Sequence, residues 1–350
     1  MLGVLRVLLA LMVMAKHLFL HVGPLGSYPV FGFYLISGYL MTLTLHQSYG
    51  YSARGRLRFA FNRFLRLYPM YWAVALLSAL LVWVMARGDA RAYHYALYLP
   101  RTAWEVLSNL LMIYPTWIPW HTVPRLSPPT WALGVELCFY ALMALGASAT
   151  VRRTLVWLGA SLAYMALTLW LGWGEGDRYF PVPAASLPFS MGALLSYVAR
   201  PDAAGWMRAL MRCACKAPAW LVFVLFAGNC ALWSALYKTL GPVAEIGQFL
   251  NLLLCGWLLL VLVAGGRFLP VSAALDKRVG DYSYPFYLLH WQVGMFLTWC
   301  WPGAPVRGNT WAEAGMFVAA VVVVAGVSWC LLRFVEQPLQ QLRQRVRAKG

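Results

Sequence analysis

The sequence predicts an all-α polytopic integral membrane protein, with about ten transmembrane helices and both termini in the cytoplasm. Three observations lead to this fold class. Of the 350 residues, 62% are hydrophobic and 11% are charged, and the mean hydropathy is +0.65, whereas a soluble domain is roughly a quarter charged. Apolar runs of about 20 residues, the length that crosses a bilayer, recur along the chain. The connections between these runs alternate in positive charge, which orients such a bundle.

Ten apolar runs are long enough to be membrane spans. They lie at residues 2–22, 29–46, 67–86, 127–147, 154–172, 183–199, 218–237, 246–264, 281–301 and 312–334. The sixth run is the weakest because it contains Pro183 and Pro188. Segment 95–120 is apolar but contains three prolines, so we expect a long loop with an interfacial or re-entrant piece. Residues 1–350 are expected to form one membrane-embedded domain with no fused soluble domain.

Basic residues gather in alternate connections of this arrangement. One side holds 20 of the 28 Lys and Arg residues, namely Arg6, Arg54, Arg56, Arg58, Arg63, Arg66, Arg152, Arg153, Arg200, Arg208, Arg212, Lys216, Arg267, Lys277, Arg278, Arg333, Arg343, Arg345, Arg347 and Lys349. The opposite loops hold Arg87, Arg91, Arg101, Arg125, Arg178, Lys238 and Arg307. The positive-inside rule therefore places both termini in the cytoplasm. The net charge of +17 then reflects topology and contact with anionic membrane lipids, and we expect no nucleic-acid partner. The basic tail is expected to anchor at the membrane surface.

The first run is expected to be a retained span, because no small-residue cleavage site follows it. The seven cysteines show no metal or disulfide spacing and are expected to be packing residues. We therefore expect no metal site and no permanently bound cofactor.

Three titratable side chains stand out deep inside the predicted spans, where a charge costs roughly 2.5 to 3.5 kcal/mol. His17 lies beyond the midplane of the first span, Glu136 about ten residues into the fourth and His290 about nine residues into the ninth. Because their depths agree to within about two helical turns, we expect an acid and two imidazoles to meet in one cavity. Arg6 precedes His17 by eleven residues, which is three turns on the same helix face and roughly 16 Å along the axis.

Each of these residues also has a structural explanation. His17 and the neighbouring Lys16 could be interfacial residues that extend towards the membrane surface. His290 could form only an interhelical hydrogen bond, and Arg6 could be a positive-inside anchor. Glu136 is harder to explain in this way, because an unpaired carboxylate in apolar surroundings needs a partner or a proton.

The cytoplasmic sequence RFLRLYPMYW, residues 63–72, leads into the third span. Arg63 and Arg66 are three residues apart and share one face of a helix. Arginine side chains bind phosphate oxygens in bidentate fashion, which suits a nucleotide-like ligand that arrives from the cytoplasm. We attribute the other arginines of this connection, in residues 54–58, to topology.

Six segments in a fixed order give the chain a more specific identity. They are Arg6 with His17, FGFYLISGYL (31–40), RFLRLYPMYW (63–72), SPPTWALGVELCFY (127–140), DYSYPFYLLHW (281–291) and VEQPL (335–339). Each is a weak pattern in an apolar sequence, but together they cover nearly the whole chain. In this order they resemble the acyltransferase-3 family of membrane O-acyltransferases.

This resemblance implies transfer of an acyl group, commonly acetyl, from cytoplasmic acyl-CoA as co-substrate to a hydroxyl of a carbohydrate or glycolipid acceptor. By family analogy the acceptor is a bacterial surface polysaccharide or its lipid-linked precursor, and the protein lies in the bacterial inner membrane. The residues that the family requires correspond here to His17, Arg6, Arg63, Arg66 and Glu136. The resemblance also gives His290 and Ser37 a possible place in the acceptor path or at the oxyanion.

The residue types fit that chemistry. His17 is expected to be the general base, a role that contributes typically ~10²- to 10⁴-fold, and Glu136 is expected to orient it. Arg6, Arg63 and Arg66 are expected to bind the phosphates or the pantetheine end of the donor. A covalent acyl-histidine relay is an alternative mechanism that the sequence leaves open.

Two other classes of protein also place polar groups inside a membrane. A transporter or flippase has a polar substrate site at the midplane, but it predicts inverted repeats, and none is evident in the sequence. In a structural or sensing membrane protein, the same charges lock helices together.

Overall fold

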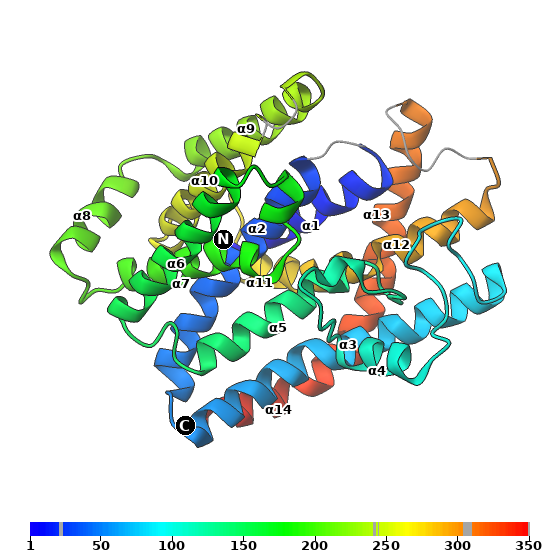
Figure 1. The fold of residues 1–350 in the computed structure, drawn as a ribbon, viewed down its shortest axis with the longest axis horizontal. Coiled ribbons are helices and arrows are strands. Elements are labelled where there is room, and N and C mark those ends of the chain that lie inside the picture. Colours follow the sequence, from blue (N-terminus) through cyan, green and yellow to red (C-terminus); the bar gives the residue numbers. More distant parts are fainter. Residues whose placement is uncertain (21–23, 241–242, 244, 304–309, 349–350) are drawn as a thin grey trace.

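The computed structural model describes residues 1–20, 24–240, 243, 245–303 and 310–348, and its regular elements in these ranges are helices (Figure 1). Each predicted apolar run corresponds to one helix: α1 (Leu2–Leu18), α2 (Pro24–Thr44), α3 (Ala53–Ala86), α5 (Thr130–Ala144), α6 (Val151–Trp170), α7 (Ser186–Val198), α9 (Ala219–Leu240), α10 (Ile246–Val263), α12 (Ser283–Cys300) and α13 (Trp311–Leu331). The all-α fold is thereby confirmed. Residues 21 and 22 of the first predicted span, Arg307 and Lys349 lie outside the described residues.

Five stretches of the described chain are long and apolar enough to cross a membrane. They are Leu25–Tyr49, Ala53–Ala86, Ala219–Tyr237, Ile246–Val263 and Trp311–Val346. With the other apolar helices around them, these stretches make the protein an integral membrane protein. The total of ten spans and the cytoplasmic location of the termini stay predictions.

Shorter helical elements occupy the connections. They are η1 (Leu45–Tyr49), α4 (Ala103–Leu111), η2 (Pro119–His121), η3 (Glu175–Arg178), η4 (Val182–Ala185), α8 (Gly205–Ala214), α11 (Ala273–Asp281), η6 (Leu332–Glu336) and α14 (Gln337–Ala348). Helix α4 lies within the segment expected to be a loop with an interfacial piece, and its Trp104, Leu107 and Leu110 are exposed. This exposed apolar face is consistent with an interfacial helix.

Helix α3 begins at Ala53 and so includes most of residues 47–66, the connection between the second and third predicted spans. Ser52 caps the helix, because its side chain accepts a hydrogen bond from the backbone N–H of Gly55 at 3.1 Å. The 34 residues extend over roughly 50 Å, more than the ~30 Å hydrocarbon core. Hydropathy detects only the part of this helix that lies in lipid, and arginine is itself a good helix former.

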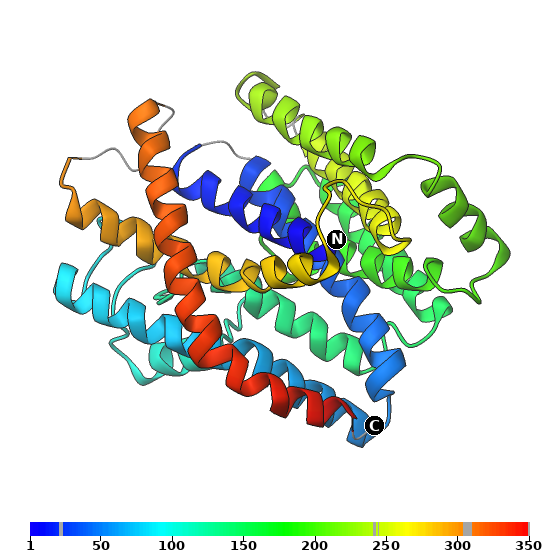
Figure 2. The same cartoon turned by 180° about the vertical axis from the view of Figure 1, so that it is seen from behind.

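Helices α1, α2 and α12 form the centre of the bundle (Figures 1 and 2). Helix α1 packs against α2, α11 and α12, while α2 packs against α7 and α10. The approach of α2 to α7 requires glycine, because a Cβ on Gly192 would lie 1.9 Å from the carbonyl oxygen of Leu35, and one on Gly38 would lie 2.2 Å from that of Phe189. Small residues allow this kind of close helix contact inside a membrane.

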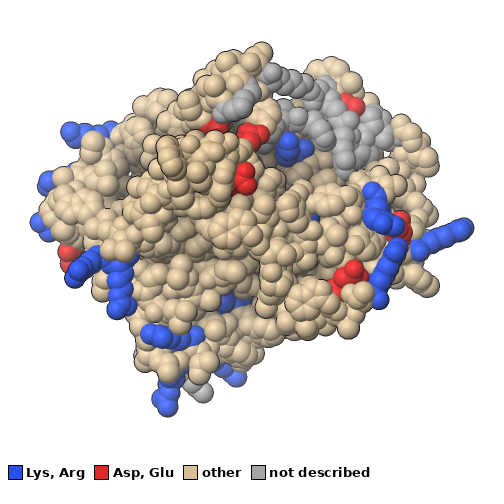
Figure 3. Space-filling model, in the orientation of Figure 1, with Lys and Arg blue, Asp and Glu red and all other residues tan. Residues whose placement is uncertain are grey.

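On the face shown in Figure 3, most charged side chains lie either towards the lower left or towards the top and right, with a broad uncharged surface between these two groups. We call the end where α3 and α6 begin the basic end; it carries Arg54, Arg56, Arg152 and Arg153. The sequence predicts that this end is cytoplasmic. An uncharged belt between two charged ends is the surface expected for a protein that spans a bilayer.

The C-terminal helix α14 lies along the first half of α3 (Figure 2). Arg58 donates to the carbonyl oxygen of Val346 at 2.6 Å, and the Asn62 amide donates to that of Arg343 at 3.0 Å. The basic tail is therefore attached to the bundle, in addition to the membrane-surface role expected for it.

Candidate active site

A cavity of about 140 Å³ lies between α1, α2, α3, α5 and α12. Its polar lining consists of Arg6, Tyr34, Ser37, Arg63, Arg66, Glu136, Tyr140, Ser283, Tyr284 and Tyr287. The structure thus brings together the three arginines that the sequence assigned to one donor site. Three guanidinium groups against one carboxylate leave an excess of positive charge, which favours an anionic ligand. We call this space the arginine cavity.

The three arginines differ in how they are held. Arg66 donates to Glu336 at 2.5 Å, and Arg343 of α14 donates to the same carboxylate oxygen. Arg63 donates to the Asn62 side chain at 2.9 Å, but its Nε is buried without a hydrogen-bond partner. Arg6 forms no hydrogen bond or ion pair with the described residues, although it lies within electrostatic range of Glu136. The cavity therefore retains unused N–H donors, which buried groups rarely leave unsatisfied.

Glu136 lies on the wall of the arginine cavity formed by α5. Ser37 donates to its Oε1 atom at 2.5 Å, and the hydroxyl of Tyr140 donates to the same atom. Tyr140 is a site residue that was not predicted from the sequence. The available signal was its spacing, because a residue four positions after Glu136 lies on the same helix face.

His17 and His290 form a pair inside the bundle. The Nδ1 atom of His17 lies 2.9 Å from Nε2 of His290, and the two rings stack with centroids 5.0 Å apart. The Trp291 ring lies 4.9 Å from that of His17. If the shared proton resides on Nδ1 of His17, the opposite Nε2 atom carries a lone pair and can act as a base.

The arrangement of the imidazoles and the carboxylate differs from the expectation. Glu136 was expected to orient His17, but the structure gives His17 the neighbour His290 and gives Glu136 the donors Ser37 and Tyr140. The reason is the depth at which α5 begins. Residues 122–129 enter the bundle before the helix starts, so counting from the predicted surface at residue 127 placed Glu136 too far towards the outer end.

Arg125 stabilises this irregular entry. It lies in a non-helical connection, as expected, but its side chain is 0% exposed. It donates to the carbonyl oxygens of Trp120, Thr122 and Pro128. Non-helical backbone persists inside a membrane protein only where its polar groups are satisfied in this way. Arg125 therefore has a structural role.

Tyr287 connects the arginine cavity to the imidazole pair. Its ring lines the cavity, and its centroid lies 6.3 Å from that of His290, three residues further along α12. Its hydroxyl donates to the carbonyl oxygen of Pro129 at 3.1 Å, which ties it to the start of α5. The arginine cavity and the imidazole pair are therefore neighbours, because Tyr287 and His290 are less than two turns apart along α12.

The fold and the site define an integral membrane protein with a charged cavity and an imidazole pair inside its helix bundle. A family model for an acyltransferase domain matches residues 2–333, and the chain belongs to this acyltransferase-3 family, as its motifs predict. It is 24% identical over 352 residues to acyltransferase MdmB of Streptomyces mycarofaciens, an alignment that covers 94% of this chain and 84% of that protein. No solved structure matches the chain.

Proposed function

We propose that the protein transfers an acyl group, with acetyl as the expected group, from acyl-CoA to a hydroxyl of a carbohydrate acceptor. The observation that carries this proposal is the position of the His17–His290 pair beside the arginine cavity, one turn of α12 beyond Tyr287. A cationic cavity suits the phosphates of a CoA thioester. An imidazole next to it suits activation of a weak hydroxyl nucleophile.

In this proposal the donor enters from the basic end. Arg63 and Arg66 hold its phosphates, and Arg6 neutralises charge further inside. The pantetheine arm then extends along the tyrosine-lined wall of the cavity towards the imidazole pair. Glu136 limits the local excess of positive charge and keeps Ser37 and Tyr140 in place through its two hydrogen bonds.

His17 is the proposed base. Its Nε2 atom removes the proton from the acceptor hydroxyl while the hydroxyl oxygen attacks the thioester carbonyl. The C–S bond then breaks, the acyl group remains on the acceptor oxygen, and the CoA thiolate takes the proton from the imidazolium. His290 keeps Nδ1 of His17 hydrogen-bonded during these steps, which is the orienting role that the sequence analysis gave to Glu136.

The proposed acceptor is a bacterial surface polysaccharide or its lipid-linked precursor, and the proposed location is the bacterial inner membrane. Both rest on family analogy. Membrane lipids surround the bundle, and acyl-CoA is a co-substrate that is consumed in each cycle.

Transfer of label from acetyl-CoA in membranes tests the proposal. We expect wild-type membranes to acetylate endogenous glycans, and His17→Ala to lower the rate by roughly 10²- to 10⁴-fold at an unchanged protein level. Loss of the protein from the membrane in His17→Ala would instead indicate a structural role. Substrate transport without acyl transfer would contradict the proposal.

The relay mechanism is separated by a second measurement. Incubation with labelled acetyl-CoA in the absence of acceptor should leave no label on the protein if transfer is direct. Covalent label that is present in the wild type and absent in His17→Ala would replace general-base catalysis with an acyl-histidine intermediate.

A further inference from the structure

A second cavity of about 240 Å³ lies at the opposite end of α1 from Arg6. It is formed by the last turn of α1, the start of α2, the η3 segment, the end of α9 and the start of α10. Its polar lining includes Lys16, Ser27, Glu175, Tyr237 and Gln248. The cavity shares no lining residue with the arginine cavity.

Several polar groups that line this cavity have hydrogen-bonding capacity that the described residues do not use. Gln248 is only 8% exposed and forms no hydrogen bond with the described residues. Lys16 has no carboxylate partner among them, and Glu175 receives one hydrogen bond, from Tyr237 at 2.7 Å. An amide that faces a cavity and makes no protein hydrogen bond is available to a ligand. Unused donors and acceptors that face one space indicate a ligand that supplies both.

The walls of the cavity are aromatic, and an ion pair joins two of the segments that form them. Arg178 and Glu245 form a buried bidentate ion pair at 2.5 and 2.6 Å, which joins η3 to the start of α10. The rings of Tyr28 and Tyr179 line the same space. Aromatic walls with a few polar groups are typical of small-molecule sites. Flat apolar rings beside an amide, a carboxylate and an ammonium match the C–H faces and hydroxyls of a sugar.

We propose that this cavity binds a sugar ring of the acceptor. The inference rests on the proposed function and adds the binding site and the direction of approach. Lys16 directly precedes His17 on the last turn of α1, so the cavity lies at the same end of α1 as the proposed base, on a neighbouring face of the helix. The acceptor then arrives from the end opposite to the one that admits the donor, and both substrates can be bound together.

Photo-crosslinking tests the site without requiring turnover. The probes are diazirine-bearing glycosides of glucose, galactose, mannose and rhamnose, each as a methyl glycoside and as a dodecyl glycoside. The methyl series represents free sugar and the dodecyl series a lipid-linked one. We expect at least one probe to label peptides that line the cavity, and Gln248→Leu and Lys16→Met to reduce that labelling at least fivefold. Arg101→Met, a cation removed from an exposed loop near the C-terminal end of α3, is the matched control and should label like the wild type.

Thermal unfolding distinguishes a ligand-binding amide from a structural one. Gln248→Leu should unfold at or above the wild-type temperature, because the Gln248 amide has no protein hydrogen bond to lose. Acetyl-CoA binding should stay unchanged in both variants. Equal labelling of wild type and variants, labelling elsewhere, or no labelling by any probe would overturn the proposed site. Labelling of the cavity without any acyl transfer would retain the site and overturn the transferase.

Discussion

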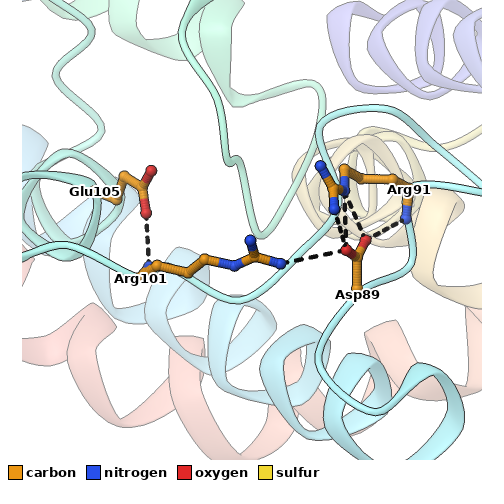
Figure 4. Close-up of polar contacts among 4 residues, drawn as sticks. All are labelled: Asp89, Arg91, Arg101 and Glu105. Carbon is orange, nitrogen blue, oxygen red and sulfur yellow. Dashed lines mark hydrogen bonds and ion pairs between the residues drawn. The ribbon is translucent and has the colours of Figure 1, made fainter.

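Two clusters of arginines and carboxylates, one inside the bundle and one on a loop, have similar composition and different surroundings. In the loop cluster, Asp89 accepts hydrogen bonds from Arg91 at 2.9 Å and from Arg101 at 3.3 Å (Figure 4). The side chains of these arginines are 53% and 61% exposed. In the inner cluster, Glu336 holds Arg66 and is only 2% exposed.

The energetics of the two clusters differ accordingly. Exposed ion pairs contribute about 0 to 1 kcal/mol, because water and salt screen them. Burying charged groups costs several kcal/mol per ion, so a buried cluster is retained where it serves a structural or functional purpose. The number of arginines therefore does not locate a site, whereas burial next to a cavity with unused donors does.

Arg63→Gln is expected to have the largest effect, and to raise the KM for acetyl-CoA far more than a substitution in the loop cluster does. A hydrogen bond to a charged group contributes about 1.5 to 3 kcal/mol, so the KM for acetyl-CoA should rise by roughly 10- to 100-fold. Steady-state transfer kinetics measure this change. Arg101→Gln in the loop cluster is the control, and an equal rise in both variants would remove the distinction.

Glu336→Gln should have the next largest effect. Without the carboxylate, the Arg66 and Arg343 side chains face each other without a counter-charge, and breaking a buried pair costs about 3 to 5 kcal/mol. We expect a lower unfolding temperature and a KM for acetyl-CoA about tenfold higher, because Arg66 loses its position. Glu336→Asp should recover part of the KM effect; a variant that only unfolds earlier, with normal KM, would limit Glu336 to stability.

Asn62→Ala should have a smaller effect. The Asn62 side chain joins α14 to Arg63, through a hydrogen bond to the Arg343 carbonyl at 3.0 Å and one from Arg63 at 2.9 Å. Its loss should raise the KM for acetyl-CoA by only about threefold, since Arg63 keeps its charge and loses only a hydrogen bond that positions it. An unchanged KM would show that α14 does not influence the donor site.

Asp89→Asn should have the smallest effect. Hydrogen bonds from Arg91 lower the pKa of Asp89 to about 2, against an ordinary value near ~3.9. A carboxylate with a lowered pKa stabilises the fold at pH values above its ordinary pKa. This stabilisation is lost as the pH falls through about 2. Between pH 5 and 8, roughly, this carboxylate should make no pH-dependent contribution, and transfer should change less than about twofold. Transfer rates across this pH range check both points, and a larger loss would show that the loop cluster takes part in function.

Much of the fold could be predicted from hydropathy. Every apolar run became a helix, because the backbone in lipid must satisfy its own hydrogen bonds. The start of α3 was not predicted because Arg54 and its neighbours lower the hydropathy of a segment that is still helical. The non-helical segment at residues 122–129 was not predicted. A single buried side chain, Arg125, satisfies its backbone carbonyl groups, and hydrophobic periodicity does not reveal such hydrogen bonds.

The candidate site could be predicted from the sequence to a similar degree. Spacing and motifs placed Arg6, Arg63 and Arg66 together, and the structure shows them around one cavity. Depth along separate helices was less informative, because helix starts are staggered within the bundle. This stagger pairs His17 with His290 and leaves Glu136 in the cavity.

The central claim is that the arginine cavity binds the donor and the imidazole pair performs the transfer. The most direct test measures acetyl-CoA binding and single-turnover transfer on the same purified protein in lipid nanodiscs. The account predicts that His17→Ala binds acetyl-CoA like the wild type but transfers nothing measurable, while Arg63→Gln binds it at least tenfold more weakly. Loss of binding in His17→Ala, or normal binding in Arg63→Gln, would contradict it.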